Sequence, residues 1–556
     1  MKKFYRALTA LIAAVAMLFA GGVVFAGTAM ADAKYSITIE NEKTGHSYKA
    51  YQIFSGTLGG NGSDDANPSL GNIQWGSGIT EAGRTALIAK YLNGAEGKTA
   101  KDVADYLAAN KGVVREFAEL IGGKGNAAGY LGTVAGEATV PSDGKYVISG
   151  LSAGYYLVKD DSNLADQDDA NSAYILDVVD NVTVKPKSET PTVDKKVHDT
   201  KQDGATSEQE EGNTGTDGWG ETADHAINQS FQFKLTANLP ADNNWDAYPT
   251  YKVVFTDTMS TGITFENIAS VKVDGIAVSA GEANNQYQKT INDNTDAGAN
   301  GTSWTLTIND IKSVTGESGK KPDLTDGATI EVIYNAHLNK DAQVTDTTGS
   351  ATTNKNGVSL QYSNNPNGDG LGKTEGPDVY VYTFKIANTK MDGKGTEDTG
   401  DDTALANVGF RLYSDKDATQ EIKLSKNTDG TYSPIADQAN GEGVEMKSGS
   451  DGTFDIVGLD AGTYYLKETS PLPGYDGLPT RTITIVAKHK LNPDKTPTVD
   501  LTGSSNMSNK LVNQPGSSLP STGGMGTMIL YAAGIAVVVF AGLGLAVTLR
   551  KRQSRR

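Results

Sequence analysis

The residue types that most often carry out chemistry are sparse in this chain of 556 residues. It contains no cysteine, so neither a thiolate nucleophile nor a disulfide is available. Five histidines are scattered along the sequence, and none has the spacing of a metal motif such as HExxH. No GxSxG or P-loop pattern occurs, and the acidic stretch 392–402 lacks the spacing of an EF-hand loop. The sequence therefore predicts no cofactor, no metal site and no conventional enzyme.

The composition is acidic and rich in turn-forming residues. Sixty-seven acidic side chains outnumber 49 basic ones and give a net charge of −18, which repels phosphate and argues against a nucleic-acid partner. The chain has 64 glycines, and most of its aromatic residues are tyrosine. This composition favours many short strands joined by turns, so a mainly β protein is expected.

The first 31 residues have the features of a secretory signal peptide. Lys2, Lys3 and Arg6 form a positive start, an apolar run follows, and residues 29–31 read Ala-Met-Ala. This small-residue pattern predicts export and cleavage after Ala31.

The C-terminus combines a short motif, an apolar run and a basic tail. Residues 525–549 are uncharged, and as a helix they would span roughly 37 Å, enough to cross a bilayer. Five basic residues follow and would stay on the cytoplasmic side. Directly before the span stands the pentapeptide Leu519, Pro520, Ser521, Thr522 and Gly523.

This arrangement, over 515–556, resembles the LPxTG sorting signal of Gram-positive surface proteins. The resemblance implies that a sortase cleaves between Thr522 and Gly523 and passes the Thr522 carboxyl to an amine. Pro520 keeps the motif extended, because it cannot donate to a helix or central strand. The precursor would be held briefly at the membrane, and the product would be secreted and anchored to the cell wall. Loss of both ends lowers the net charge from −18 to −26.

The exported part divides into three domains, at 32–190, 191–377 and 378–514. Linkers rich in Pro, Gly and charge occur near 185–193 and 371–380. The first domain has alternating, strand-like runs and two helical patterns, at 81–94 and 99–123. The stretch 145–161 recurs at 453–470 as Gly-Leu-x-Ala-Gly followed by Tyr and Lys, so the first and last domains share a building block. The middle region lacks it and predicts a larger β-sandwich.

The last domain resembles the CnaB-like immunoglobulin-type domains of Gram-positive adhesins and pilins. The matching stretches are Lys-Met-Asp at 390–392, 405–412, and 464–475, although Asn-Val stands at 407–408 where the pattern has Gly-Ala. The resemblance implies an isopeptide bond from Lys390 to an asparagine on the last strand, with Glu468 as proton shuttle. We expect Asn509 as the partner, with Asn513 as its rival. Burial would lower the pKa of the amine and raise that of the acid, as amine attack requires.

The middle domain resembles the larger, CnaA-like domain of backbone pilins. Val193, Lys195 and Val197 share strand parity, so Lys195 should face the core. The resemblance implies that Asp257, in the sequence VFTDTM, is the acid. We expect Asn356 as the amide partner, with Asn364 and Asn354 as rivals of the same parity.

The first domain lacks a matching lysine. Asp160 stands where Glu468 does in the repeat, but Glu40 or Asn41 occupies the position of the attacking amine. We therefore expect no isopeptide bond there, and this domain should be the most labile.

A lysine for polymerisation is expected between the first two domains. Residues 182–187, Val-Thr-Val-Lys-Pro-Lys, resemble the VxVYPK motif of backbone pilins, with Lys185 in place of Tyr. The resemblance implies that Lys187 accepts the Thr522 carboxyl of the next subunit, with Lys185 as a rival acceptor.

Taken together, these features resemble those of a sortase-assembled backbone pilin. The implied partners are pilin-class and housekeeping sortases, further copies of the chain, peptidoglycan, accessory or tip pilins, and a host glycan or matrix. A monomeric wall-anchored adhesin is the alternative, because it shares every feature except a need for Lys187.

Overall fold

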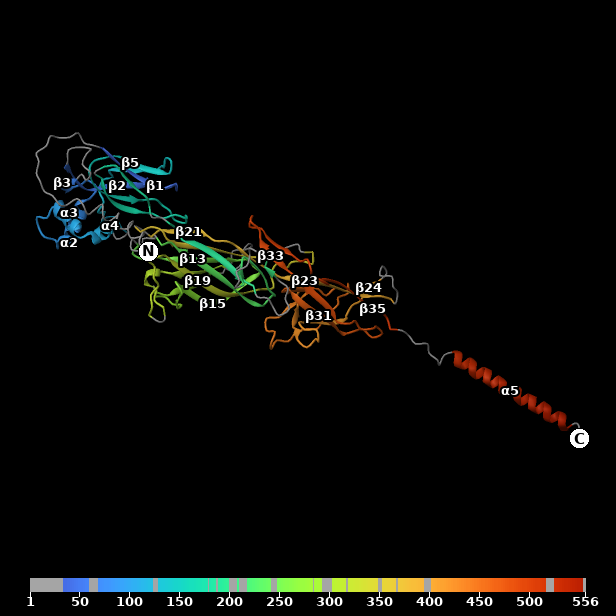
Figure 1. Cartoon of the computed structure of the whole chain (residues 1–556). Helices are drawn as coiled ribbons and strands as arrows, with labels where there is room; N and C mark the ends of the chain where they lie inside the picture. The colour runs from blue at the N-terminus through green and yellow to red at the C-terminus, as the bar shows by residue number, and fades with distance from the viewer. Residues whose placement is uncertain are drawn as a thin grey trace, which may run out of the picture.

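A computed structural model shows three β-rich domains in a row, followed by one C-terminal helix, in an elongated molecule (Figure 1). The structure describes residues 34–59, 69–123, 129–178, 180–186, 189–199, 208–209, 218–241, 248–283, 285–292, 303–316, 319–348, 353–366, 369–394, 402–516 and 525–553. The predicted signal peptide, Lys187 and the motif at 519–523 lie outside the described residues.

The first domain combines two small sheets with a group of helices. Its elements are β1 (Tyr35–Glu40), β2 (Tyr48–Gly59), β3 (Ser69–Trp75), α2 (Glu81–Leu92), α3 (Ala100–Ala109), a 3₁₀ turn (Lys111–Val113), α4 (Val114–Gly122), β4 (Gly136–Ala138), β5 (Lys145–Leu151), β6 (Gly154–Asp160), β7 (Ala173–Val178) and β8 (Val182–Val184). One sheet has the order β5-β1-β8, and the other has the order β3-β2-β6-β7 with β4 on β2. A capping box between Thr99 and Asp102 starts α3. Leu87, Val103 and Phe117 bury the apolar faces of the three helices against the second sheet.

The middle domain is a sandwich of two larger sheets. Its elements are β9 (Thr192–His198), β10 (Glu208–Gln209), β11 (Trp219–Gly220), β12 (Thr222–Asp224), β13 (Ser230–Leu239), β14 (Val253–Met259), β15 (Ile263–Val273), β16 (Ile276–Ala277), β17 (Tyr287–Asn292), β18 (Ser303–Ile308), a 3₁₀ turn (Ile311–Ser313), β19 (Ala328–Leu338), β20 (Asn354–Ser363), β21 (Leu371–Glu375) and β22 (Val379–Tyr382). The orders are β11-β9-β13-β19-β15-β16 and β12-β22-β20-β14-β18-β17, with β21 on β20. Burial alternates along β13 and β19, as expected for strands with one face on a core. Aromatic side chains fill part of that core, with Trp304 edge-on to Tyr334.

The last domain is a smaller sandwich. Its elements are β23 (Phe384–Asp392), β24 (Thr403–Ala404), β25 (Gly409–Tyr413), β26 (Glu421–Ile422), β27 (Leu424–Lys426), β28 (Tyr432–Pro434), β29 (Met446–Lys447), β30 (Ile456–Leu459), β31 (Gly462–Ser470), β32 (Arg481–Ile485), β33 (Lys488–Leu491), β34 (Pro497–Asp500) and β35 (Ser508–Asn513). One sheet has the order β24-β23-β30-β28-β27 with β35 on β23, and the other has the order β26-β25-β31-β32 with β29 on β25. The pairing of β23 with β35 is parallel.

This architecture confirms the predicted fold class of tandem, mainly β sandwiches with helices added to the first domain. The repeated stretch forms β5–β6 in the first domain and β30–β31 in the last. Strand β22 pairs with β12 and β20, so the two larger sheets of the middle domain end before Thr383. A short sheet of order β10-β33-β34 combines strands of the middle and last domains. The four hydrophobic cores of the described chain lie between Ile37 and Leu511.

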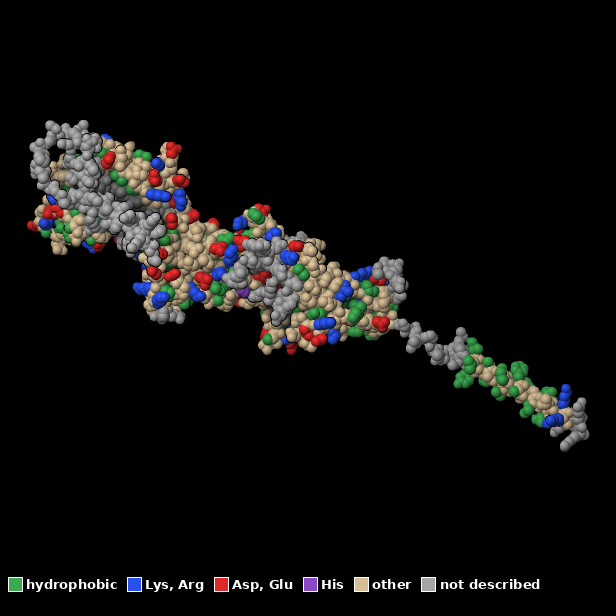
Figure 2. Space-filling model, viewed as in Figure 1, with side chains coloured by type: hydrophobic (Ala, Val, Ile, Leu, Met, Phe, Trp, Pro, Cys, Tyr) green, Lys and Arg blue, Asp and Glu red, His purple; other side chains and the backbone are tan. Residues whose placement is uncertain are grey.

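The C-terminal helix α5 (Met525–Gln553) stands apart from these cores. Residues Met528–Arg552 are long and apolar enough to cross a membrane, with none of that window buried. Figure 2 shows hydrophobic side chains along α5 and basic side chains at its end. Arg550, Lys551 and Arg552 form this basic end within the described part of the chain.

The first two domains meet through the segment between β6 and β7. The side-chain amide of Asn364, at the end of β20, donates to the carbonyl oxygens of Leu164 (2.8 Å) and Asp169 (2.9 Å). The Asp168 carboxylate accepts from the hydroxyl of Tyr362 at 3.0 Å. These bonds tie a loop of the first domain to one edge of the middle sheet.

The middle and last domains meet around β12. The amide of Ile227 donates to the carbonyl of Gly458 at 2.9 Å, and Asn228 donates to the carbonyl of Pro434 at 2.8 Å. Gly458 has φ +80°, and a Cβ there would lie 2.4 Å from Cδ1 of Ile227. This close approach requires glycine at the junction.

Candidate functional sites: buried lysine and histidine clusters

Lys195 points into the core of the middle domain. Along β9, burial alternates so that Val193, Lys195 and Val197 face inward, as their shared parity predicts. The neighbouring Lys196 lies on the other face, 3.5 Å from Glu221. A lysine amine with no exposed surface is costly unless it is paired or neutral, so this position is chemically unusual.

Four side chains surround the amine of Lys195. Its Nζ lies 2.5 Å from Asp257 Oδ2 and 2.6 Å from Asn356 Oδ1. The hydroxyl of Tyr334 donates to Asp257 at 2.8 Å and accepts from the amide of Asn356 at 2.7 Å. The ring of Phe233 lies 5.3 Å from Nζ. The geometry brings an amine, an acid and a carboxamide into one closed, apolar site.

Burial disfavours the charged form of both titrating groups. It lowers the pKa of Lys195 to about 8, even though the neighbouring Asp257 opposes this shift. It likewise raises the pKa of Asp257, with Lys195 opposing. Both directions favour a neutral amine beside a protonated acid, which is the pair that attack on a carboxamide needs.

The two rival asparagines of the middle domain have other partners. Asn354 donates to the carbonyls of Gln343 and Val381, both at 3.1 Å. Asn364 bonds across the junction to the first domain. Asn356 is therefore the asparagine of β20 that lies against the lysine.

Lys390 occupies a comparable position in the last domain. It lies inward on β23 with no exposed surface, and its Nζ donates to the carbonyl of Leu511 at 3.1 Å. Burial lowers the pKa of Lys390 to about 8, while the charges of Glu468 and Asp392 oppose the shift.

Glu468 contacts Asn513 at the end of β35. The amide of Asn513 donates to Glu468 Oε1 at 2.9 Å. Within the described chain, Glu468 Oε2 and Asn513 Oδ1 are buried and have no hydrogen-bond partner. Asn509 instead donates to Asn388 (3.0 Å) and accepts from Arg481 (3.3 Å). The structure thus places Glu468 against the rival Asn513, and Lys390 within reach of the charge of Glu468, whereas the hydrogen bonds of Asn509 go elsewhere.

The first domain has a histidine cluster at the corresponding end of its repeat. His46 is fully buried, with Nδ1 2.7 Å from Asp160 and Nε2 2.9 Å from Asp169. Hydrogen bonds and charge from both carboxylates outweigh burial and raise the pKa of His46 to about 9. Lys43 lies 3.2 Å from Asp169. Sequence reasoning missed His46, because a lone histidine carries no spacing signal; the position of Asp160 in the repeat was the available clue.

Glu40 and Asn41, the residues at the position of the attacking lysine in the first domain, are not part of the His46 cluster. Glu40 is exposed and lies 3.5 Å from Lys145. Asn41 is buried and donates to the hydroxyl of Tyr48 at 2.9 Å.

The motif between the first two domains is partly described. Val182, Thr183 and Val184 form β8, which pairs in parallel with β1. Lys185 follows and is exposed, whereas Lys187 lies outside the described residues.

Comparisons with known proteins give matches to the last domain and to most of the chain. Residues 385–502 match the SpaA prealbumin-like fold domain. The three-domain T6 backbone pilin of serotype M6 Streptococcus pyogenes has a TM-score of 0.50 at 16% identity, covering 88% of this chain and 100% of that one. The major pilin SpaD of Corynebacterium diphtheriae has a TM-score of 0.42 at 16% identity, covering 87% and 98%. The major pilin subunit BcpA of Bacillus cereus has a TM-score of 0.39 at 14% identity, covering 87% and 100%. None of the curated proteins matches significantly.

The likeness to the T6 pilin shows that this chain shares the modular three-domain fold of that protein. The matches are to structural subunits and indicate no catalytic family.

Proposed function

We propose that this protein is a structural backbone subunit of a surface fimbria. A sortase would cleave after Thr522 and join its carboxyl to Lys187 of the next subunit, building an open, head-to-tail fibre. The fold of a backbone pilin, the LPSTG motif at 519–523 and the apolar span at Met528–Arg552 support this proposal. The fibre would be anchored to peptidoglycan and support adhesion to host surfaces.

Two intramolecular isopeptide bonds would strengthen each subunit. In the middle domain, neutral Lys195 Nζ attacks Cγ of Asn356, and Asp257 passes a proton to the leaving amide nitrogen, which departs as ammonia. The amine proton that is lost returns to Asp257, so the acid is regenerated. Holding both groups in one closed core supplies the effective concentration that an isolated amine and amide lack.

The contact of Lys195 Nζ with both Asp257 and Asn356, in a site without exposed surface, is the observation that carries this proposal. In the last domain we propose Lys390 and Asn513 with Glu468 as the acid, in preference to Asn509. The hydrogen bond between Asn513 and Glu468 supports that choice.

The intact mass of the folded exported part, 32–516, tests the bonds. Each isopeptide releases one ammonia, roughly 17 Da, so the chain should weigh roughly 34 Da less than its sequence. A mass equal to the sequence mass would end the proposal of isopeptide bonds.

Wall extracts boiled in detergent test polymerisation separately. A ladder of sizes on a denaturing gel supports a covalent fibre, and Lys187→Ala should reduce the ladder to monomer. Lys185→Ala serves as the matched control and should leave the ladder intact. A single band from the unaltered protein would favour the monomeric wall-anchored adhesin.

A further inference from the structure

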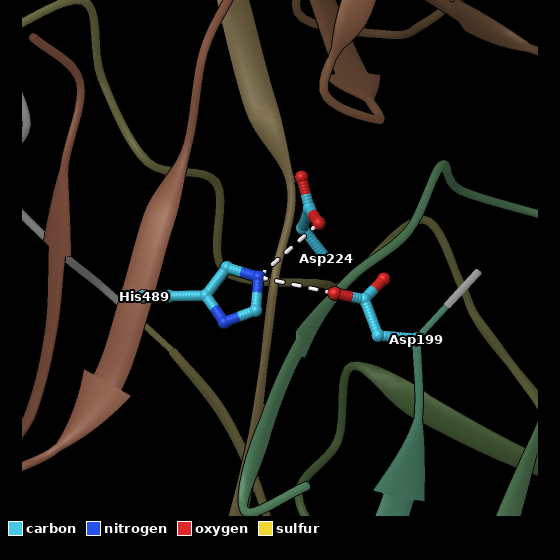
Figure 3. Close-up of side chains that lie close together, drawn as sticks. All are labelled: Asp199, Asp224 and His489. Atoms are coloured by element: carbon cyan, nitrogen blue, oxygen red, sulfur yellow. Dashed lines mark hydrogen bonds and ion pairs between the residues drawn. The ribbon is translucent and has the colours of Figure 1, made fainter. Parts of the chain in front are cut away.

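A second histidine cluster lies where the middle and last domains meet. His489, on β33 of the last domain, faces two carboxylates of the middle domain: Asp224 at the end of β12 and Asp199 just after β9 (Figure 3). The side chains of His489 and Asp224 have no exposed surface, and that of Asp199 is 7% exposed. The three groups converge on one point, although they come from two domains.

The three side chains present one ligand atom each to a common space. Nε2 of His489 lies 3.3 Å from Asp199 Oδ2 and 3.3 Å from Asp224 Oδ1. All three ligand atoms lie within 4.8 Å of one another. A metal ion needs ligand atoms that face a common centre, and these three atoms are close enough together to do so.

Contacts behind the cluster fix the orientation of the ligands. Nδ1 of His489 lies 2.8 Å from the hydroxyl of Thr222, which leaves Nε2 to face the carboxylates. The other oxygen of Asp224 accepts from the backbone amide of Ala461 at 3.0 Å, which turns Oδ1 toward the imidazole. Partners of this kind behind the ligands are characteristic of protein metal sites.

The cluster around His46 provides an internal comparison. There the carboxylates lie on opposite ring nitrogens, at 2.7 and 2.9 Å, which are the lengths of charge-assisted hydrogen bonds. Both contacts of His489 are longer and share one nitrogen. Ligands roughly 2.1 Å from a tetrahedral zinc ion lie about 3.4 Å from one another, so the 3.3 Å separations at His489 match ligands around an ion.

Charge and ligand type indicate which ion would fit. A neutral imidazole and two ionised carboxylates would together carry two negative charges, which a divalent cation would cancel. Imidazole with carboxylate is a common donor set for zinc, whereas calcium takes six to eight oxygen ligands.

We propose that Asp199, Asp224 and His489 bind one zinc-class divalent ion between the middle and last domains. The ion takes the electron pair of Nε2, and any proton on that nitrogen is released to solvent. One tetrahedral position remains for water. The bound ion adds one more link to a junction where β10 already pairs with β33 and hydrogen bonds cross between the domains, and so it limits bending at this junction of the subunit.

Metal binding to the exported chain, 32–516, tests the proposal. This part contains all four hydrophobic cores of the described chain. After removal of metal with EDTA and desalting, zinc chloride is titrated calorimetrically, and bound zinc is counted by elemental analysis. We expect one zinc per chain, no binding of calcium at the same concentration, and higher thermal stability with zinc.

Variants separate this site from the other histidine cluster. His489→Gln should weaken zinc binding at least 100-fold, and Asp199→Asn at least 10-fold, while His46→Gln should bind as the unaltered chain does. Asp199→Asn changes the least buried ligand, so this variant still tests the zinc site if His489→Gln does not fold. Absence of zinc from the unaltered chain, or full binding by a folded ligand variant, would overturn the proposal.

Discussion

The first domain and the two domains that follow it bury charge in different ways. In the middle domain a lysine amine lies with an acid and a carboxamide, and burial favours neutral Lys195 and protonated Asp257, since it lowers the pKa of the first and raises that of the second. In the last domain burial likewise lowers the pKa of Lys390. In the first domain, His46 lies between two carboxylates, and its pKa is raised so that it stays charged.

The repeat makes this difference instructive. Asp160 and Glu468 stand at the same position of the repeated hairpin, at the end of β6 and on β31. Asp160 faces an imidazole that cannot form a stable amide, whereas Glu468 lies with Asn513 and near Lys390. Whether the domain can form a covalent or an ionic link therefore depends on the residue that faces the acid, and not on the hairpin that carries the acid.

Removing the amine of the middle domain should have the largest effect. Lys195→Ala should leave the chain short of only one ammonia and lower the free energy of unfolding of the middle domain. The two joined residues are 161 apart, and closing a loop of that length is worth about 5 kcal/mol. Mass spectrometry and calorimetric melting measure both effects.

Lys196→Ala is the matched control, because it changes the outward face of the same strand. A two-ammonia deficit that persists in Lys195→Ala would contradict the assignment of this lysine.

A pair of substitutions on β35 distinguishes the two asparagines of the last domain. Asn513→Ala should abolish one of the two ammonia losses. It should also lower the free energy of unfolding of the last domain by about 5 kcal/mol, because the loop that a bond to Lys390 closes is again long. Asn509→Ala should keep both ammonia losses, because Asn509 bonds to Asn388 and Asn506. Peptide mapping of the joined fragments checks the result, and the reverse pattern would restore Asn509 as the partner.

The stability of the first domain should depend on pH through His46. The pKa of His46 rises from 6.5 to about 9 on folding, so its contribution is complete below pH 6.5 and is lost as pH rises through 9. The loss should be about 3 kcal/mol. On the acid side, the pKa of Asp169 is lowered, so its contribution disappears below about pH 4.

Calorimetric melting between pH 6 and 10 measures this dependence. His46→Gln should remove the alkaline slope and make the first domain the earliest site of trypsin cleavage at every pH. A first domain that melts identically at pH 6 and pH 10 would show that the imidazole carries no charge there.

The repeated glycine offers the smallest and most local test. Gly150 and Gly458 occupy the same repeat position with φ near +80°, but a Cβ at Gly150 meets open space, whereas at Gly458 it meets Ile227. Both alanine variants should cost about 1 kcal/mol for the backbone conformation, and Gly458→Ala should cost about 1–2 kcal/mol more. Equal melting temperatures for the two variants would show that the junction of the middle and last domains accommodates the added methyl group without loss of stability.

Local patterns in the sequence were sufficient for much of the fold. Alternating apolar residues predicted the strands, and parity predicted that Lys195 rather than Lys196 faces the core. Three-to-four spacing predicted helical stretches at 81–94 and 99–123, the second of which the structure divides into α3 and α4. These features depend on periodicity within a single element, which a sequence displays directly.

Choices between elements depended on tertiary structure. Asn509, Leu511 and Asn513 all face inward on β35, so parity cannot select among them; the packing of β31 brings Glu468 to Asn513. His489 and Asp224 are 265 residues apart and meet because two domains dock. No sequence periodicity links such residues, because their side chains come together only after sheets pair and domains pack. The histidine clusters could therefore not be predicted from the sequence.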